Sequence, residues 1–264
     1  MSKRPWARSL NAVAEGSPLV HCMTNIVVAG FTANVLLAIG ASPAMVENAE
    51  ESADFAAIAG AVLVNLGTLS AEREEAMAAA AAAAHKAGRP WVLDPVAVGA
   101  LAHRTTFAAE LLTHGPTVIR GNASEIASLA GMAGAAGRGV DSSVGSDQVI
   151  EPAKALARAC GAVVAVSGAV DYVTDGQQVV DVPGGDLLMT RVTGVGCALG
   201  AMMAAFAAVV DDPLQATVDA SATLALAGGI AARGPRPGPG TFAVRLIDTL
   251  ADLAAGAEAE EAPR

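Results

Sequence analysis

The chain has 264 residues, a net charge of −10 at pH 7, and a composition that is 53% hydrophobic but only 3% aromatic. A chain of this length and apolar content can bury a large core. Its pI near 4.8 and the lack of any Lys/Arg cluster exclude the basic surface that binds nucleic-acid phosphates.

The N-terminal two thirds alternate short apolar runs with longer helical patterns, after a polar segment 1–16 that lacks the apolar core of a secretory signal and is expected to be a flexible end. Continuous apolar strands that alternate with helices predict parallel βαβ units and a three-layer αβα sandwich. The expected strands are Pro18–Cys22, Ala61–Leu66, Pro90–Asp94, Thr117–Arg120 and Ala162–Val166. The expected helices are Asn25–Ala38, Ser70–Lys86, Thr105–Thr113, Ala123–Ala130 and Asp147–Cys160.

The C-terminal third begins with a hairpin signal. Tyr172–Thr174 and Gln177–Val182 flank Asp175-Gly176, so an antiparallel hairpin is expected to end the mostly parallel sheet. Only helices are expected after it, at Ala198–Val210, Leu214–Ala232 and about Thr241–Leu253. Gly131–Gly145 and Arg233–Gly240 are expected loops, and 255–264 is an expected flexible end. No shift in composition marks a boundary, so residues 1–264 are predicted to form a single domain.

Two nearly uncharged runs, Pro18–Val46 and Val192–Val210, are long enough to be weighed as membrane spans. The first is broken by a proline and glycines, and glutamates rather than Lys or Arg flank it. The second contains Gly196-x-x-x-Gly200, a spacing that in soluble proteins marks close helix packing more often than a membrane dimer. Neither run is predicted to cross a membrane.

The three cysteines, Cys22, Cys160 and Cys197, are far apart in the sequence and form no C-x-x-C pair. An odd number of separated cysteines favours reduced thiols over disulfides or a zinc site. Reduced thiols are typical of cytoplasmic proteins, so a cytoplasmic location is expected.

The most informative segment is 191–200, which reads Arg-Val-Thr-Gly-Val-Gly-Cys-Ala-Leu-Gly. Gly194 and Gly196 precede an apolar run expected to be a buried helix. A glycine turn at a helix start exposes backbone N–H groups at the positive end of the helix dipole, where an anion can bind. Phosphate in this turn and a base at Cys197 would make a phosphotransferase. A packing turn with a core cysteine explains this stretch, taken alone, at least as well.

Polar residues also stand where three predicted strands end, and α/β sheets bind ligands at the carboxyl ends of their strands. Asp94, Arg120 and Ser167 are each ordinary turn residues when taken alone. Together with the glycine turn they favour one site, in which Arg120 offers a planar fork for phosphate. Asp94 and Glu125 are hard oxygen ligands suited to magnesium. The P-loop pattern G-x-x-x-x-G-K-[ST] is absent.

The glycine turn resembles the G-A-G-D anion hole of ribokinase-like kinases, with Cys197 at the position of the Asp that serves as base. Within that superfamily, T-G-x-G-C is similar to hydroxyethylthiazole kinases. The resemblance runs from about Pro18 to Leu253. The other segments that carry it are VHCMTN at 20–25, GASPAM at 40–45, LDPV at 93–96, RGNASEI at 120–126 and VSG at 166–168.

The resemblance implies a ribokinase-like fold and ATP-dependent phosphorylation of the hydroxyl of 4-methyl-5-(2-hydroxyethyl)thiazole, in thiamine salvage. It also implies Mg²⁺ and a homotrimer with the thiazole site between subunits. The residues that it assigns are Met45, Gly194 and Asn25 to the thiazole, Arg120 and Ser167 to ATP, Asp94 and Glu125 to the metal, and Cys197, Gly194 and Gly196 to catalysis.

Two positions depart from the family's pattern, because Ser167 stands where Thr is frequent and Ala97 where the family has Gly. Either hydroxyl can donate a hydrogen bond. Ala97 costs on the order of 1 kcal/mol if the backbone there needs a positive φ.

Cys197 stands at the expected start of a helix, where the helix N-terminus lowers the pKa of a thiol. A lowered pKa would favour a role of this thiol as general base. Because phosphoryl transfer needs little help from a base, we expect this thiol mainly to position the substrate hydroxyl.

Three alternatives remain open at this point. One is a hydroxymethylpyrimidine or sugar kinase of the same fold, although those kinases usually keep Asp at the position of Cys197. Another is a repair dehydratase of the superfamily that acts on hydrated nicotinamide nucleotides. The third is an inactive small-molecule-binding or assembly protein, against which the intact Asp94, Arg120, Glu125 and glycine turn argue.

Overall fold

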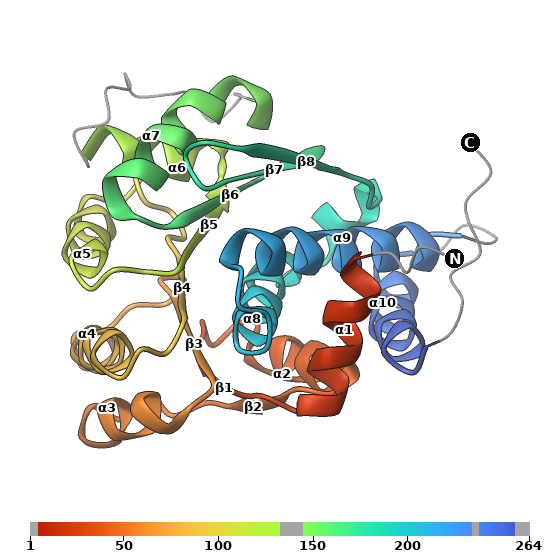
Figure 1. Cartoon of the computed structure of the whole chain (residues 1–264), viewed down its shortest axis with the longest axis horizontal. Coiled ribbons are helices and arrows are strands. Elements are labelled where there is room, and N and C mark those ends of the chain that lie inside the picture. The colour runs from red at the N-terminus through yellow and green to blue at the C-terminus, as the bar shows by residue number, and fades with distance from the viewer. Residues whose placement is uncertain (1–4, 133–144, 234–237, 257–264) are drawn as a thin grey trace.

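A computed structural model describes residues 5–132, 145–233 and 238–256. Its centre is an eight-stranded sheet in the order β2-β1-β3-β4-β5-β6-β7-β8 (Figure 1). The pairs from β2 through β6 are parallel, whereas β7 and β8 pair antiparallel as a hairpin. This confirms the predicted mostly parallel sheet with its terminal hairpin. The strands are β1 Leu19–Met23, β2 Ser42–Ala44, β3 Ala61–Asn65, β4 Trp91–Asp94, β5 Val118–Asn122, β6 Val163–Ser167, β7 Val170–Thr174 and β8 Val179–Pro183.

Helices cover both faces of the sheet and complete the predicted three-layer αβα sandwich (Figure 1). One face carries α3 Ala49–Ile58, α4 Ala71–Lys86, α5 Ala102–Leu112, α6 Ala123–Met132 and α7 Ile150–Cys160. The other carries α1 Pro5–Gly16, α2 Ala29–Ala38, α8 Val195–Ala207, α9 Pro213–Ala231 and α10 Pro239–Ala254. Two 3₁₀ turns, η1 Ser146–Val149 and η2 Leu187–Arg191, complete the described elements.

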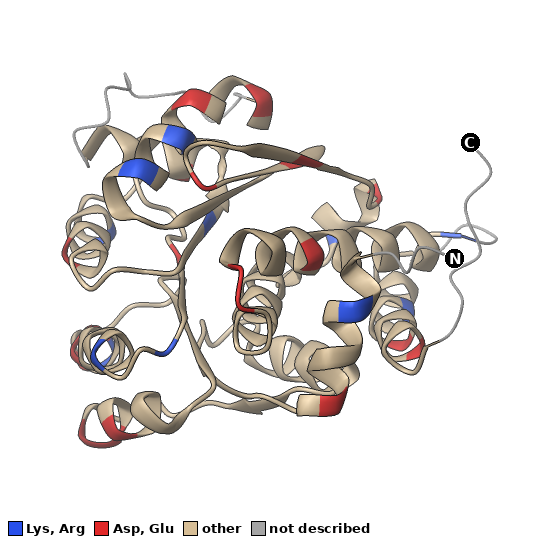
Figure 2. Cartoon of the chain, in the orientation of Figure 1, with Lys and Arg blue, Asp and Glu red and all other residues tan. Residues whose placement is uncertain are grey.

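The strands β1, β3, β4 and β6 are mostly apolar because side chains from both of their faces are buried. On β3, Leu63 belongs to the core beneath α8, whereas Val62 and Val64 belong to the core beneath α4. Charged residues lie mainly on the helices and connecting loops, and Lys and Arg are scattered singly in the view of Figure 2. Helix α8 packs against β1, β3 and β4, and ten of its residues are buried. Its N-terminus therefore lies at the carboxyl edge of the sheet.

None of the helices in the described ranges combines the length and apolarity that crossing a bilayer requires.

The expectation of a flexible end at residues 1–16 is wrong for residues 5–16, which form α1. Leu10 and Val13 on this helix are fully buried against the core. The hydroxyl of Ser9 donates to Asp219 on α9 over 2.6 Å, which ties the two helices together. The helical spacing of these apolar residues was obscured by the polar residues between them.

Other differences are local. Helix α2 begins at Ala29 rather than at Asn25, because residues 26–28 form a turn. The short strand β2, helix α3 and η2 were not predicted. Parts of four expected loop or end segments lie outside the described residues: 1–4 of the N-terminal end, 133–144 of Gly131–Gly145, 234–237 of Arg233–Gly240, and 257–264 of the C-terminal end.

Candidate active site

A row of hydrogen bonds joins the ends of β1, β3 and β4 to the start of α8. The amide of Asn25 donates to Cys197 Sγ over 3.3 Å and to Asn65 Oδ1 over 3.0 Å. Asn65 in turn donates to Asp94 Oδ2 over 2.6 Å. Asn65 was not predicted as a site residue, although it is the last residue of β3 and the strand-end argument applies to it equally. The row brings Asn25, Asp94 and Cys197 together, as expected.

Asp94 keeps one carboxylate oxygen free. The residue is fully buried, and burial raises its pKa to about 6 despite the opposing charge of Arg120. Its Oδ1 has no hydrogen-bond partner in the described part of the chain, and Arg120 Nη1 lies 3.7 Å away. Because a buried oxygen without a partner is costly, Oδ1 fits a position that a ligand or ion completes.

Arg120 lies against the start of α8 and is bound by Ser167. Its Nε and Nη2 donate to Ser167 Oγ over 3.1 and 2.9 Å. A Cβ built on Gly196 would lie 2.8 Å from Nη2 and 2.9 Å from Nη1, so only glycine admits the guanidinium here. Gly194 has φ +94°, and a Cβ there would lie 2.8 Å from Val28. The two glycines therefore open the helix N-terminus to the site.

Both carboxylate oxygens of Glu125 accept hydrogen bonds from backbone N–H groups of neighbouring loops. Its Oε1 accepts from the backbone N–H of Ala97, and its Oε2 accepts from that of Asn122, both over 2.9 Å. These bonds join the loop after β4 to the end of β5. Since Asp94 begins that loop, Glu125 orients Asp94 through the backbone, and its charge also raises the pKa of Asp94.

Ala97 has a positive φ of 65°, the condition under which its methyl group is unfavourable. We expect Ala97→Gly to raise the free energy of unfolding by up to about 1 kcal/mol, the lost strain being partly offset by the entropy of glycine in the unfolded chain. Urea denaturation measures the change. Ala87→Gly is the control, because Ala87 has φ −85° and glycine should destabilise it. If the Ala97→Gly protein were less stable than wild type, the inference that the backbone is strained at Ala97 would be contradicted.

Cys197 is a neutral thiol near pH 7. Burial raises its pKa, and the charge of Asp94 raises it further, against smaller opposing effects from Asn65, Arg120 and Asn25. The expectation that the helix N-terminus lowers this pKa is therefore wrong for this site. Desolvation and a nearby carboxylate both disfavour a thiolate.

Two arginines from neighbouring helices hold the loops around this site. Arg73 on α4 donates to the carbonyl of Thr24 and pairs with Glu47 over 2.5 Å. Arg104 on α5 donates to the carbonyls of Gly67 over 2.8 Å and Val96 over 3.2 Å. The loops after β1, β2, β3 and β4 are thereby bound to two helices, a role that no local sequence pattern indicated.

Met45 follows β2 at the neighbouring strand end and packs, partly buried, against the core beneath α8. No hydrogen bond links it to the row that contains Cys197. The loop after it is held by His21, whose Nε2 donates to Val46 O over 2.7 Å in its neutral form. Burial lowers the pKa of His21, which agrees with a core histidine rather than a catalytic one.

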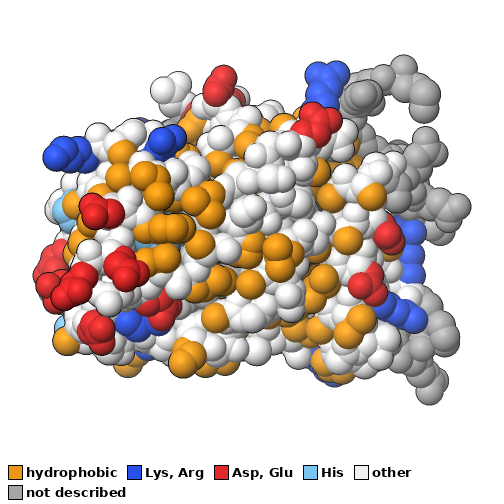
Figure 3. Space-filling view, turned by 90° about the horizontal axis from the view of Figure 1, so that it is seen from below, with side chains coloured by type: hydrophobic (Ala, Val, Ile, Leu, Met, Phe, Trp, Pro, Cys, Tyr) orange, Lys and Arg blue, Asp and Glu red, His pale blue; other side chains and the backbone are white. Residues whose placement is uncertain are grey.

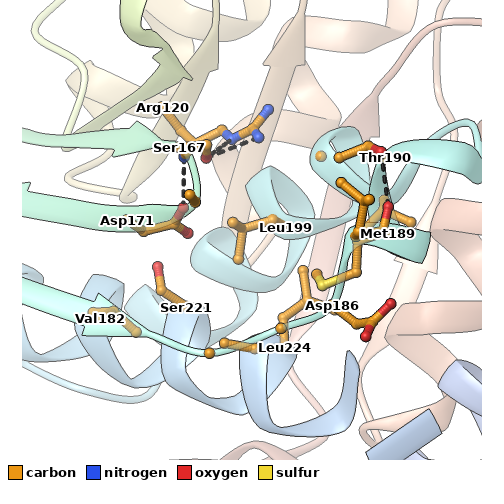
Figure 4. A pocket seen from close by; sticks show the side chains of 18 residues that line it. Arg120, Ser167, Asp171, Val182, Asp186, Met189, Thr190, Leu199, Ser221 and Leu224 are labelled. Atoms are coloured by element: carbon orange, nitrogen blue, oxygen red, sulfur yellow. Dashed lines mark hydrogen bonds between the residues drawn. The ribbon is translucent and has the colours of Figure 1, made fainter. Parts of the chain in front are cut away.

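A cavity of about 620 Å³ opens beside Arg120, Ser167 and Gly196 (Figure 4). It lies between the β7–β8 hairpin, η2, α8 and α9, and its volume suits a nucleotide-sized molecule. Its polar end is formed by Arg120 and Ser167. The remaining lining residues are Gly168, Ala169, Asp171, Val182, Gly184, Gly185, Asp186, Leu187, Met189, Thr190, Val195, Gly196, Leu199, Ser221, Leu224 and Ala225.

Comparisons with known proteins agree over nearly the whole chain. Residues 10–256 match the model of the hydroxyethylthiazole kinase family. A hydroxyethylthiazole kinase from Leptospira borgpetersenii is 55% identical over 237 residues, which are 90% of this chain and 89% of that protein. A solved hydroxyethylthiazole kinase from Pyrococcus horikoshii superposes with a TM-score of 0.86 at 39% identity, covering 93% of this chain and 92% of the other.

A more distant solved structure supports the fold alone. A ribokinase-like superfamily protein from Enterococcus faecalis superposes with a TM-score of 0.60 at 12% identity, covering 94% of both chains. The predicted ribokinase-like architecture is therefore confirmed by an arrangement of strands and helices that persists without close sequence similarity.

Proposed function

The chain belongs to the hydroxyethylthiazole kinase family, and on that premise we propose that it transfers the γ-phosphoryl group of ATP to the hydroxyl of 4-methyl-5-(2-hydroxyethyl)thiazole, for thiamine biosynthesis. The observation that carries this function is the joint presence of the family match and of one site that unites Asp94, Arg120, Ser167 and the glycine turn. We also propose that the chain works as a single kinase domain, because one sheet supports all of these residues.

Arg120 and Ser167 bind the phosphates of ATP in this proposal. The guanidinium is permanently charged and lies at the polar end of the cavity, where the N-terminus of α8 adds partial positive charge. Gly194 and Gly196 leave the backbone N–H groups of that helix start accessible to the transferred phosphoryl group. Such preorganised donors stabilise the charge of the transition state.

Magnesium is held by Asp94 and assisted by Glu125 in this proposal. The free Oδ1 of Asp94 fits a hard cation, whereas both oxygens of Glu125 already accept backbone N–H bonds and suit contact through water. Within the described ranges, no three His, Cys, Asp or Glu side chains gather as a metal cluster. Phosphate and water would therefore supply most ligands of Mg²⁺, which neutralises phosphate charge when bound.

The thiazole lies near Asn25, Met45 and Gly194 in this proposal, between subunits of a homotrimer. Two exposed apolar residues directly after Asn25 support a covered surface: Ile26 is 77% exposed and Val27 is 66% exposed. The face near the β2 edge also shows hydrophobic side chains across a region with few charges (Figure 3). Light scattering measures the assembly, and a stable, active monomer would contradict an intersubunit site.

Cys197 positions the substrate hydroxyl in this proposal, because its thiol is neutral and is bound by Asn25. We therefore expect Cys197→Ala to lower turnover by less than about tenfold, since a lost positioning contact costs less than a lost base. Steady-state kinetics measure the change, with ATP binding followed by calorimetry as the control. Loss of all turnover with intact ATP binding would identify the thiol as essential to proton transfer.

A coupled assay of ADP release tests the function itself. We expect ADP release to depend on hydroxyethylthiazole and to be absent with hydroxymethylpyrimidine or a sugar. Release that is independent of the thiazole, or absent with it, would contradict the proposal. We place the reaction in the cytoplasm, where ATP is abundant and where the three free thiols of Cys22, Cys160 and Cys197 are stable.

A further inference from the structure

Ser221 on α9 has a buried hydroxyl without a partner. The residue is 1% exposed, and its Oγ makes no hydrogen bond with any residue that the structure describes. A serine within a helix commonly donates to the carbonyl four residues earlier, but this hydroxyl instead faces the cavity beside Arg120 (Figure 4). Since a buried hydroxyl without a partner is unfavourable, its position indicates a polar ligand in the cavity.

Asp171 on β7 lines the same cavity and lies toward Ser221 in the close-up view (Figure 4). Its Oδ1 accepts from the backbone N–H of Gly168 over 2.9 Å, which fixes the carboxylate in place. Among the described residues, Oδ2 accepts no hydrogen bond. Asp171 thus presents one oriented oxygen acceptor to the cavity, although burial raises its pKa against the opposing effects of Gly168 and Arg120.

These two side chains lie between chemically different ends of the cavity. Arg120 and Ser167 form the end suited to phosphate, whereas Val182 and Leu224 form an apolar wall near Ser221 (Figure 4). In a nucleotide, the ribose lies between the phosphates and the base. The order of side chains along the cavity therefore matches the order of phosphate, sugar and base.

We propose that Asp171 and Ser221 bind the ribose hydroxyls of the nucleotide and select ribonucleotides over deoxyribonucleotides. Asp171 Oδ2 accepts a hydrogen bond from one hydroxyl, and Ser221 Oγ exchanges one with the other. An acidic side chain that accepts from a ribose hydroxyl is a recurrent solution in nucleotide sites of α/β proteins. This inference rests on the proposed use of ATP in this cavity. It adds that the protein recognises the ribose hydroxyls and thereby distinguishes ribonucleotides from deoxyribonucleotides.

The test compares ATP with 2′-deoxy-ATP and 3′-deoxy-ATP in wild type, Asp171→Asn and Ser221→Ala. We expect wild type to bind at least one deoxynucleotide about tenfold more weakly than ATP, because a site built for a hydroxyl rejects the analogue that lacks it. Asp171→Asn should weaken ATP binding by about tenfold, since hydrogen bonds to charged groups are the stronger ones. The ratio of the Kd for the deoxynucleotide to the Kd for ATP should fall to about twofold or less. Ser221→Ala should reduce the same ratio.

Asp181→Asn is the matched control, because Asp181 is an exposed carboxylate on the adjacent strand β8. Asn at 171 retains an oxygen for the N–H of Gly168, so thermal unfolding should show a folded variant. Calorimetric binding keeps the inference separate from turnover: ATP binding without thiazole phosphorylation would contradict the proposed function alone. An unchanged ratio in folded Asp171→Asn, or a changed preference between ATP and GTP instead, would overturn the ribose assignment.

Discussion

Asp94→Asn is expected to lower turnover by about a thousandfold, because it removes a fully buried carboxylate that lies 3.7 Å from Arg120 and that we propose to hold Mg²⁺ at the reacting phosphates. The amide oxygen of the new side chain can still accept from Asn65, in the position of Oδ2. Its NH₂ group then replaces Oδ1 and points a donor toward the Arg120 guanidinium and any Mg²⁺. The variant therefore exchanges attraction for repulsion between residue 94 and the two cations, Arg120 and Mg²⁺, that would bind the phosphates.

The fold should tolerate this substitution. Burial raises the pKa of Asp94 to about 6, so the folded state disfavours its charge relative to the unfolded chain. At pH 7 and above we expect Asp94→Asn to unfold at or above the wild-type temperature, as measured by calorimetry. Asp211→Asn, which changes an exposed carboxylate before α9, is the control and should retain full turnover. Near-wild-type turnover in Asp94→Asn would remove Asp94 from the mechanism.

Gly196→Ala is expected to raise the KM for ATP by about tenfold or more while leaving the fold intact. Its Cβ would lie 2.8 Å from the Arg120 guanidinium, which is the mobile end of a long side chain and can move aside. The displaced guanidinium would lose its bonds to Ser167, and charge-assisted phosphate contacts would go with it. Alanine also suits a helix better than glycine, so the stability of α8 should not fall.

Gly229→Ala separates this effect from a general response to alanine. Gly229 is also a helical glycine, on α9, and its nearest neighbour would lie 3.8 Å from the new Cβ, at ordinary contact distance. It should leave the KM for ATP unchanged. A Gly196→Ala enzyme with wild-type KM for both substrates would show that the position of Arg120 does not depend on this glycine.

Much of the site could be predicted because strand ends are visible in the sequence. A buried strand is a short apolar run, so the polar residues at or near its end mark the edge where ligands bind: Asp94 and Ser167 are the last residues of their strands, and Arg120 lies two residues before the end of β5. Asn65 obeys the same rule but was missed, because it was counted within the run Ala61–Leu66. Helix α1 was missed because its polar residues outweighed the buried Leu10 and Val13.

The pKa values and hydrogen bonds of the site residues could not be predicted from the residues next to them in the sequence. The pKa of Cys197 follows the local helix N-terminus only if the thiol is hydrated; here burial and Asp94, distant in sequence, raise it instead. For Glu125, the residue type predicts a metal ligand, and only the fold shows that both of its oxygens already accept from the backbone N–H groups of Ala97 and Asn122. Each outcome depends on which groups the fold brings within contact distance.

The sequence alone thus determined the layers of the fold, the strand ends and the glycine turn, because periodicity and turn chemistry act between residues close together in the chain. Only the tertiary structure decided which of these groups meet. Asn25 contacts Cys197 across 172 positions, and Arg120 contacts Ser167 across 47. Desolvation, charge and hydrogen bonding act through space, so the buried, unpaired oxygen of Asp94 and the raised pKa of Cys197 arise only once the chain has folded.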